Sequence, residues 1–318
     1  MTRVIVFGSI NMDVVTSCER HPRAGETVLG NSVGFYPGGK GANQAIAAAR
    51  RVGGSCLIGS VGADEFGKRM LAYLQANGVD TSGVTIEGGT PTGVAVITVD
   101  AQGENTIVVT PGANALATAP AHLPARGSGA LVALAQLETP IAQITRLFAA
   151  VRRAGGMTIL NPSPYQSLPR ELLQNTVIVI ANEHEFAQLA GRSAADQPQD
   201  IIAGLQSAEL PLPCCVVTLG PAGLILAERG RAPIHLEGYK VDALDTTGAG
   251  DCFAGWFAAE IAEGSTIGEA ARRANAAAAI SVTRAGAGSS MPKKSEVESF
   301  LRCRAALAQD SSGSRTAG

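Results

Sequence analysis

Six short β-rich runs, each separated from the next by a helix-length segment, constrain the fold of this chain more than any other feature. The runs lie at residues 3–8, 56–62, 130–136, 157–162, 176–182 and 214–220. Such alternation is typical of a parallel sheet covered by helices, because each parallel connection must cross back over the sheet. The Ala-rich segments 41–53 and 266–286 both end in Gly and have the composition of covering helices. We therefore predict an α/β fold with a central, mostly parallel sheet flanked by helices.

One region interrupts this alternation. Residues 92–112 contain two β-rich runs joined by a turn at Gly103, which predicts an antiparallel hairpin. With other β-like segments, this hairpin is expected to form a small second sheet outside the main one. The expected strands of this sheet lie at about 11–17, 27–37 and 91–110. We interpret the second sheet as a lid, since closing a sheet over a site excludes water.

The composition favours one large domain. The chain has 318 residues, 46% of them hydrophobic, with a net charge of −2, so it can bury a substantial core. We predict a single domain over residues 1–310 and a disordered tail at 311–318, where apolar residues are scarce. The balanced charge and the sparse aromatics argue against a nucleic-acid partner.

No segment resembles a secretory signal or a membrane span, because the first apolar run is too short and no later stretch is long enough. The six cysteines show no CxxC spacing and are interpreted as reduced. Adjacent Cys214 and Cys215 should point to opposite faces of a strand. We expect a soluble, cytoplasmic protein with no membrane partner.

A glycine-rich loop near the start resembles a phosphate loop without completing the pattern. Residues 34–41 read GFYPGGKG and match GxxxxGK[ST] except at Gly41. Glycine cannot supply the hydroxyl that ligates Mg²⁺ in a phosphate loop. A phosphate loop also follows a buried strand, whereas the preceding residues are polar and broken by glycine. The sequence therefore argues against phosphate binding by this loop.

A second glycine-rich turn carries the strongest catalytic signal. In DTTGAGDCFAGWF, Gly248, Ala249 and Gly250 precede Asp251, and an apolar helical pattern follows. Small residues let backbone N–H groups approach an oxyanion, and the helix dipole adds positive potential. Asp251 beside such an anion hole can accept a proton from an attacking hydroxyl. An Asp251 that merely caps the helix is equally compatible with this motif taken alone.

This motif is one of nine that together resemble the ribokinase-like carbohydrate kinases, the PfkB family. In chain order they are GSINMD (8–13), PGGKGANQA (37–45), PTGV (91–94), PGAN (111–114), QLETP (136–140), NPSP (161–164), NEHE (182–185), VTLGPAG (217–223) and DTTGAGD (245–251). Their order within residues 3 to about 302 makes the resemblance specific. It implies the ribokinase-like three-layer sandwich with a small β-sheet lid.

The resemblance also implies a sugar site. Its residues would be Asn11, Asp13, Gly39, Lys40, Asn43, Glu138 and Asp251. Asn11 and Asp13 lie two positions apart, so in an extended segment both side chains project to one face. The presence of Asn11 favours ribose over deoxyribose, because a polar group that expects a hydroxyl is costly to leave unpaired. Without the resemblance, Glu138 reads as an exposed residue that begins a loop.

For the nucleotide, the resemblance implies a separate set of contacts. The ATP-binding residues would be Asn182, Thr218, Gly220, Gly223, Gly250 and Asn275. Glu185 matches the acidic end of an NxxE motif that is linked to Mg²⁺ through water. A hard cation that keeps several waters suits one remote carboxylate plus the ATP phosphates. A helix-surface Glu185 is the alternative.

The family's monovalent-cation site is implied beside the anion hole. Its K⁺ would be held, mostly through backbone carbonyls, by Asp245, Thr247, Ser281, Arg284, Gly286 and Ser290. A cation there would order the turn before Asp251 electrostatically. The resemblance further implies a homodimer formed through the lid, whose β-rich edges offer pairing surfaces.

The activity implied by this resemblance is ATP-dependent phosphorylation of D-ribose at its C5 hydroxyl. Asp251 would be the general base, Mg-ATP the phosphoryl donor and K⁺ an activator. A kinase of another small sugar or nucleoside, such as deoxyribose, fructose or adenosine, remains an alternative because fold and catalytic motifs are shared. A non-catalytic sugar sensor on the same fold is the other alternative, but a broken GAGD motif would be its signature, and the motif is intact.

Overall fold

The computed structural model describes residues 4–123, 130–193, 197–207 and 212–313. Its main sheet contains β1 (Val4–Phe7), β4 (Ser55–Gly62), β5 (Val79–Glu87), β8 (Val132–Ala135), β9 (Met157–Leu160), β10 (Ile178–Asn182), β11 (Cys214–Thr218), β12 (Leu224–Glu228) and β13 (Ile234–Leu236). The nine strands lie in the order β13-β12-β11-β10-β9-β8-β1-β4-β5. In this order, neighbouring strands from β11 to β5 pair in parallel, whereas β12 pairs antiparallel with both β11 and β13 at one edge. The predicted α/β fold is confirmed.

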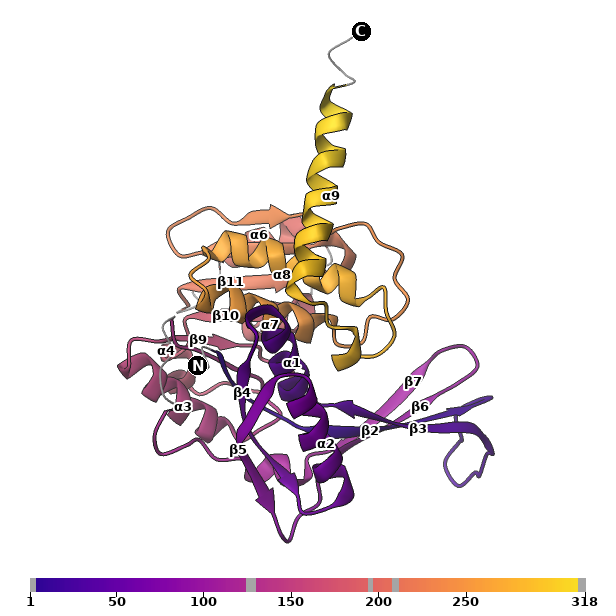
Figure 1. Ribbon diagram of the computed structural model, residues 1–318. Coiled ribbons are helices and arrows are strands. Elements are labelled where there is room, and N and C mark those ends of the chain that lie inside the picture. Colours follow the sequence, from indigo (N-terminus) through magenta and orange to yellow (C-terminus); the bar gives the residue numbers. More distant parts are fainter. Residues whose placement is uncertain (1–3, 124–129, 194–196, 208–211, 314–318) are drawn as a thin grey trace.

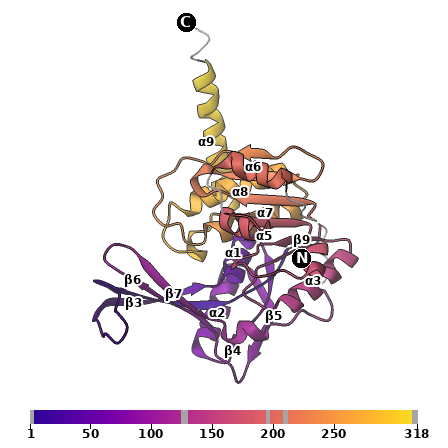
Figure 2. The ribbon, with the colours of Figure 1, turned by 180° about the vertical axis from the view of Figure 1, so that it is seen from behind.

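Helices cover both faces of this sheet (Figures 1 and 2). They are α1 (Lys40–Val52), α2 (Glu65–Ala76), α3 (Ile141–Arg153), α4 (Arg170–Gln174), α5 (Glu183–Leu189), α6 (Pro198–Ser207), α7 (Ala249–Ala262), α8 (Ile267–Ser281) and α9 (Lys294–Gly313). Because side chains alternate along a strand, β1 sends Val4 and Val6 into one core with α1, α7 and α8. Its Ile5 and Phe7 enter a second core with α3 and α5.

Helix α7 is buried on nearly every side, as expected for a helix that is apolar all round. It crosses α1 at Gly255, where close contact requires the absence of a side chain. A Cβ built at Gly255 would lie 2.3 Å from the carbonyl oxygen of Gln44 and 2.6 Å from Cβ of Ala47. Since Gly255 is one helical turn after Asp251, this crossing brings the start of α7 against the start of α1.

A second sheet of four strands projects from the body of the molecule (Figure 1). It consists of β2 (Asn11–Cys18), β3 (Gly30–Gly38), β6 (Gly93–Val99) and β7 (Asn105–Thr110), in the order β3-β2-β6-β7. The predicted hairpin is confirmed, because β6 and β7 pair antiparallel. Several large apolar side chains of this sheet are exposed, namely Val33, Phe35, Val96, Ile107, Val108 and Val109.

The remaining sequence features have mixed outcomes. All six cysteines are free, and Cys214 and Cys215 lie in opposite cores, as predicted. Helix α9 continues to Gly313, so it extends three residues into the predicted tail, and residues 314–318 lie outside the described residues. Within the described ranges, no helix has the length and apolar character needed to cross a membrane.

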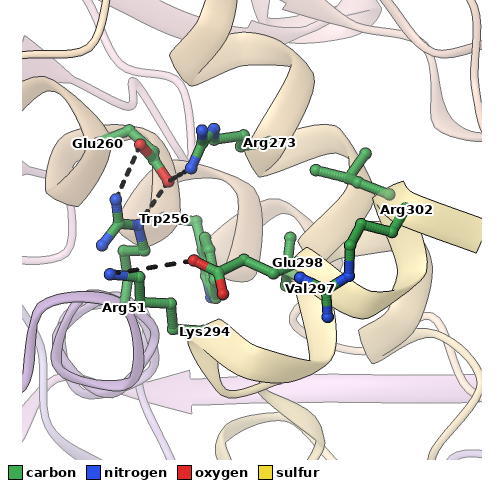
Figure 3. A pocket seen from close by; sticks show the side chains of 9 residues that line it. Arg51, Trp256, Glu260, Arg273, Lys294, Val297, Glu298 and Arg302 are labelled. Atoms are coloured by element: carbon green, nitrogen blue, oxygen red, sulfur yellow. Dashed lines mark hydrogen bonds and ion pairs between the residues drawn. The ribbon is translucent and has the colours of Figure 1, made fainter. Parts of the chain in front are cut away.

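A buried ion pair ties α1 to α7 behind the crossing (Figure 3). Arg51 Nη2 donates to Glu260 Oε2 over 3.1 Å, and Arg51 Nε donates to the other carboxylate oxygen. Arg273 on α8 reaches the same carboxylate at 3.7 Å, and Ser265 Oγ donates to it over 2.7 Å. Because the side chain of Glu260 is 0% exposed, its partners cannot be replaced by water.

Removal of Glu260 should therefore destabilise the fold strongly. We expect Glu260→Ala to lower the free energy of unfolding by about 3–5 kcal/mol, since it leaves the charge of Arg51 buried and unpaired. Urea unfolding measures the effect. Arg231→Ala is the matched control, because its pair with Glu228 is on the surface and should contribute at most about 1 kcal/mol. A loss below about 1 kcal/mol for Glu260→Ala would contradict the interpretation.

Candidate active site

Asp251 lies in the first turn of α7 and is only 8% exposed. Two side-chain amides from α1 hold its carboxylate. Asn43 Nδ2 donates to Oδ2 over 3.0 Å, and Gln44 Nε2 donates to Oδ1 over 2.9 Å. Each carboxylate oxygen thus has one donor, and the plane of the group is fixed. This is the arrangement expected of a positioned proton acceptor.

The turn before Asp251 leaves backbone amides available at the start of α7. Gly248 has a left-handed φ of 75°, and a Cβ there would lie 2.9 Å from Cβ of Ala287. In contrast, a Cβ at Gly250 would meet no atom within 4 Å beyond its chain neighbours and the backbone of its own helix, so open space lies beside this residue. The amide of Ala249 donates to the carbonyl of Thr246 over 3.2 Å. In the part of the chain that the structure describes, the amides of Gly248 and Gly250 have no acceptor.

Two predicted sugar residues, Asn11 and Asp13, lie at the start of β2, and Asp13 is near Asp251. The Asn11 side chain is buried, and its Oδ1 accepts from Asn114 Nδ2 over 2.7 Å. Burial, followed by the nearby negative charges of Glu138 and Asp251, raises the pKa of Asp13 to about 6. These electrostatic interactions place Asp13 near both Glu138 and Asp251.

Lys40 and Glu138 belong to the same group of charged residues. Burial alone would lower the pKa of Lys40, but the charges of Asp251, Glu138 and Glu185 outweigh it, and the pKa is raised. The backbone amide of Lys40 lies 3.5 Å from Glu138 Oε2, which also accepts from Ser9 Oγ. Lys40 is thus the cation of an acidic cleft, and neither it nor Glu138 is an exposed loop residue.

Gly39 allows the loop before α1 to approach the end of β1. Its φ is 92°, and a Cβ at this position would lie 2.7 Å from the backbone nitrogen of Asn11 and 2.8 Å from the carbonyl oxygen of Ser9. The preceding residues 34–38 form part of the largely exposed strand β3. The loop with the near-match to a phosphate-loop pattern therefore lies with the predicted sugar residues.

A pocket of ≈ 390 Å³ opens beside the start of α7. Most of the predicted nucleotide residues line it, namely Thr218, Gly220, Gly223, Gly250 and Asn275. Its other walls include the apolar side chains of Val241, Phe253 and Val282. Asn275 Nδ2 donates to the carbonyl of Glu237, which fixes this amide at the pocket wall. An apolar pocket that ends at open helix amides suits a flat ring carrying a phosphate chain.

Asn182 and Glu185 lie outside this lining and form a capping box at the start of α5. Asn182 Oδ1 accepts from the amide of Glu185 over 2.8 Å, and Glu185 Oε2 accepts from the amide of Asn182 over 3.0 Å. The charge of Glu185 nevertheless acts on Lys40, so it faces the cleft region. Among the described residues, no three His, Cys, Asp or Glu side chains are grouped closely enough to hold a metal.

The residues predicted for a monovalent cation come from two segments that meet beside the turn before Asp251. Asp245 accepts from the amide of Thr247 over 2.9 Å and from that of Gly286 over 2.8 Å. Burial opposes ionisation, but these donors hold the pKa of Asp245 below its ordinary value. The side chain of Arg284 pairs with Glu296 on α9. The buried Ser281 and Ser290 lie on the same segment as Gly286.

Sequence reasoning missed three polar residues at this site. Gln44 contacts Asp251, Asn114 holds Asn11, and Ser9 contacts Glu138. Each stands within or beside a recognised motif, and Gln44 is a polar residue in an otherwise Ala-rich helix. That contrast is the signal that a sequence reading can use, although it does not identify the partner.

Comparison with known proteins identifies the family of this chain. Residues 1–294 match the model of the pfkB family of carbohydrate kinases. A ribokinase from Haemophilus influenzae is 37% identical over 301 residues, which cover 93% of this chain and 97% of the relative. A ribokinase from Bacillus subtilis is 37% identical over 308 residues, covering 95% and 100%. A solved ribokinase from Arabidopsis thaliana, complexed with ribose and ATP, is 31% identical with a TM-score of 0.84, covering 95% and 99%. The chain belongs to the pfkB family of carbohydrate kinases.

The two glycines before Asp251 should respond differently to the same substitution. Gly248→Ala should lower the free energy of unfolding by about 1–3 kcal/mol, because of its positive φ and its contact with Ala287. Gly250→Ala should leave stability unchanged or raise it by up to about 1 kcal/mol, since Ala suits a helix and its methyl group meets no atom.

Kinase assays separate the effect of each substitution on turnover from its effect on stability. Gly250→Ala should lose turnover while keeping its stability, because the methyl group enters the open space in front of the amides. Thermal unfolding and kinase assays of both variants measure this. A Gly250→Ala protein with unchanged kinetics would argue against an anion hole at this turn.

The raised pKa of Asp13 predicts a pH-dependent contribution to stability. Because the folded-state pKa is about 6, above the ordinary 3.8, this contribution is present at low pH and is lost as pH rises through about 6. Asp13→Asn is neutral throughout, so between pH 5 and 8 it should gain on the order of 1 kcal/mol of stability relative to the unmodified chain. Urea unfolding at both pH values tests this, with exposed Asp242→Asn as the control. An equal difference at both pH values would refute it.

Proposed function

We propose that this chain phosphorylates D-ribose at the C5 hydroxyl, with ATP as the phosphoryl donor. The position of Asp251 carries the proposal. It lies next to Gly250, which lines the apolar pocket, and it is bonded to Asn43 at the polar cleft. A carboxylate at this junction can accept a proton from a hydroxyl in the cleft while a phosphate chain extends from the pocket. The Arabidopsis thaliana ribokinase complexed with ribose and ATP supports this choice of substrates.

In the proposed reaction, the C5 hydroxyl gives its proton to Asp251 as its oxygen bonds to the γ-phosphorus. The bond between that phosphorus and the bridging oxygen of ATP breaks, so ADP leaves and the proton passes later to solvent. The amides of Gly248 and Gly250 would stabilise the charge that develops on the phosphoryl oxygens. Lys40, already held among three carboxylates, would balance negative charge in the closed cleft.

The polar side chains of the cleft would select ribose. Asn11 is buried and already bonded to Asn114, so its amide group is fixed in orientation. Asp13 and Glu138 supply acceptors for neighbouring hydroxyls. A sugar that lacks the matching hydroxyl would leave buried polar groups unpaired, which discriminates strongly between substrates. Gly39 would let the backbone approach the sugar.

Two cations are part of the proposal. Glu185 offers an oxygen ligand with a lone pair beyond its capping bond, and it fits an Mg²⁺ bound through water. When bound, Mg²⁺ supplies charge neutralisation at the phosphates. The segments joined by Asp245 and Gly286 would hold K⁺, together with Thr247, Ser281, Arg284 and Ser290. K⁺ there would rigidify the turn that carries Gly248.

We also propose the role of the second sheet, the domain organisation and the cellular compartment of the enzyme. The projecting sheet would act as a lid and as a homodimer surface, because its exposed apolar side chains, including Phe35 and Ile107, are unusual on a monomer. We propose a single domain over residues 1–310. Six unpaired cysteines suit a reducing compartment such as the cytoplasm.

Substrate and catalytic base are tested together. ADP release should be measured with Mg-ATP and ribose, deoxyribose, fructose or adenosine, each with and without K⁺. We expect the highest kcat/KM with ribose and stimulation by K⁺. Asp251→Asn should lower kcat by at least about 100-fold, because a positioned general base contributes about 10²–10⁴. Calorimetry should show ribose and ATP binding within a few-fold of the unmodified chain.

Each failure has a distinct meaning. A preference for another sugar or for adenosine would overturn the assignment of ribose and leave the base in place. Near-normal turnover in Asp251→Asn would reject the base. Sugar binding without turnover on any substrate would favour the sensor.

A further inference from the structure

We propose that Gln44 is a positioning residue for the general base and the centre of a chain of buried side-chain amides. The inference rests on the proposed role of Asp251 and adds a residue to it. Gln44 is 0% exposed, so it is shielded from solvent behind Asp251. Asn43, the neighbouring donor, holds the other carboxylate oxygen and is itself a predicted sugar contact.

The chain of amides links three neighbouring strands of the main sheet to Asp251. Gln44 Nε2 donates to Asp251 Oδ1 over 2.9 Å and to Asn161 Oδ1 over 3.0 Å. Gln136 Nε2 donates to Gln44 Oε1. Asn161 Nδ2 donates to the carbonyl of Ile180 over 2.9 Å. Gln136 follows β8, Asn161 follows β9 and Ile180 is in β10, so the carboxylate is held from the rigid sheet.

An ionised carboxylate fixes the direction of the bonds that run from Gln136 through Gln44 to Asp251. An ionised Asp251 only accepts, so Gln44 must present its NH₂ group to it. The Oε1 atom of Gln44 then faces Gln136, which must in turn present its own NH₂ group. As a result, Gln136 Oε1 is buried and has no partner among the described residues.

That unpaired oxygen supports a functional role for the chain. Burying an acceptor without a partner is costly, and a network serving only stability has no need of it. Gln136 is also held tightly, because a Cβ on the neighbouring Gly8 would lie 2.0 Å from Gln136 Oε1. The arrangement is explained if its purpose is to direct an amide donor at Asp251.

The two carboxylate oxygens therefore have different roles. Gln44 holds Oδ1 on the buried side, while Oδ2, beside Asn43, is the oxygen available to the sugar hydroxyl. Loss of the Gln44 donor would free the carboxylate to rotate and would favour its protonated form. Both effects lower turnover without removing a contact to sugar or nucleotide.

The test compares Gln44→Met, which keeps the approximate side-chain volume and removes the donor, with Gln44→Glu, which keeps the shape and adds a charge. The matched control is Gln143→Met, because Gln143 is a partly buried helix residue that accepts from the amide of Ala119. We expect kcat for ribose to fall about 10–100-fold in Gln44→Met, with both KM values within about twofold of the unmodified chain. In Gln44→Glu, the acid limb of the pH–rate profile should move to higher pH, because two adjacent carboxylates resist joint ionisation. Gln143→Met should change none of these.

A second measurement does not depend on turnover. The ¹³C carboxyl resonance of Asp251, identified by its loss in Asp251→Asn, should titrate at a higher pH in Gln44→Met than in the unmodified chain. An unchanged titration, or a kcat within twofold of the unmodified value, would overturn the inference. A raised KM for ribose with kcat retained would also overturn it and assign Gln44 to sugar binding. If the unmodified chain phosphorylates no sugar, the proposed function fails, and the titration still decides whether Gln44 controls Asp251.

Discussion

The close crossing of α1 and α7 is the contact on which the candidate active site depends. It requires Gly255, since any side chain there would collide with the backbone of α1 at Gln44. One turn earlier, the same approach places Asp251 within hydrogen-bonding distance of two α1 amides. Behind the crossing, the Arg51–Glu260 pair fixes the helices against each other. Packing and chemistry therefore share one interface, and a shift of α7 on α1 would displace the base.

The charged groups around Lys40 determine the electrostatic properties of the candidate sugar site. Three carboxyl groups lie near one ammonium, and the effect is visible in the raised pKa values of Asp13 and Lys40. Burial is the largest cause of the raised pKa of Asp13. Lys40, in contrast, remains charged despite burial because acidic neighbours surround it. Holding these charged groups together costs folding free energy. Perturbed pKa values of this kind are typical of functional sites. Polar ligands that satisfy these groups would relieve part of the cost.

Much of the architecture could be predicted from local patterns. Buried strands such as β1, β8 and β11 are continuous apolar runs because both faces are covered, so they are conspicuous in the sequence. The edge strands β5 and β13 were not predicted, and neither was β12, which lies between β13 and β11. β5 is polar and mostly half-exposed or exposed, and β13 has only three residues, so neither shows the apolar run of a central strand. Family resemblance supplied the candidate site residues, and composition alone did not.

By itself, the sequence determined the chemistry available at each motif: a carboxylate after a glycine turn, a lysine after a pair of glycines, and a helix start at each. Those properties are local, because backbone freedom and helix capping depend on neighbours in the chain. Only the tertiary structure decided which groups meet. Gln44 and Asp251 are 207 positions apart, and their contact depends on how two helices cross over one sheet. A hydrogen bond needs placement within a few tenths of an ångström, which long-range packing provides and a sequence pattern does not state.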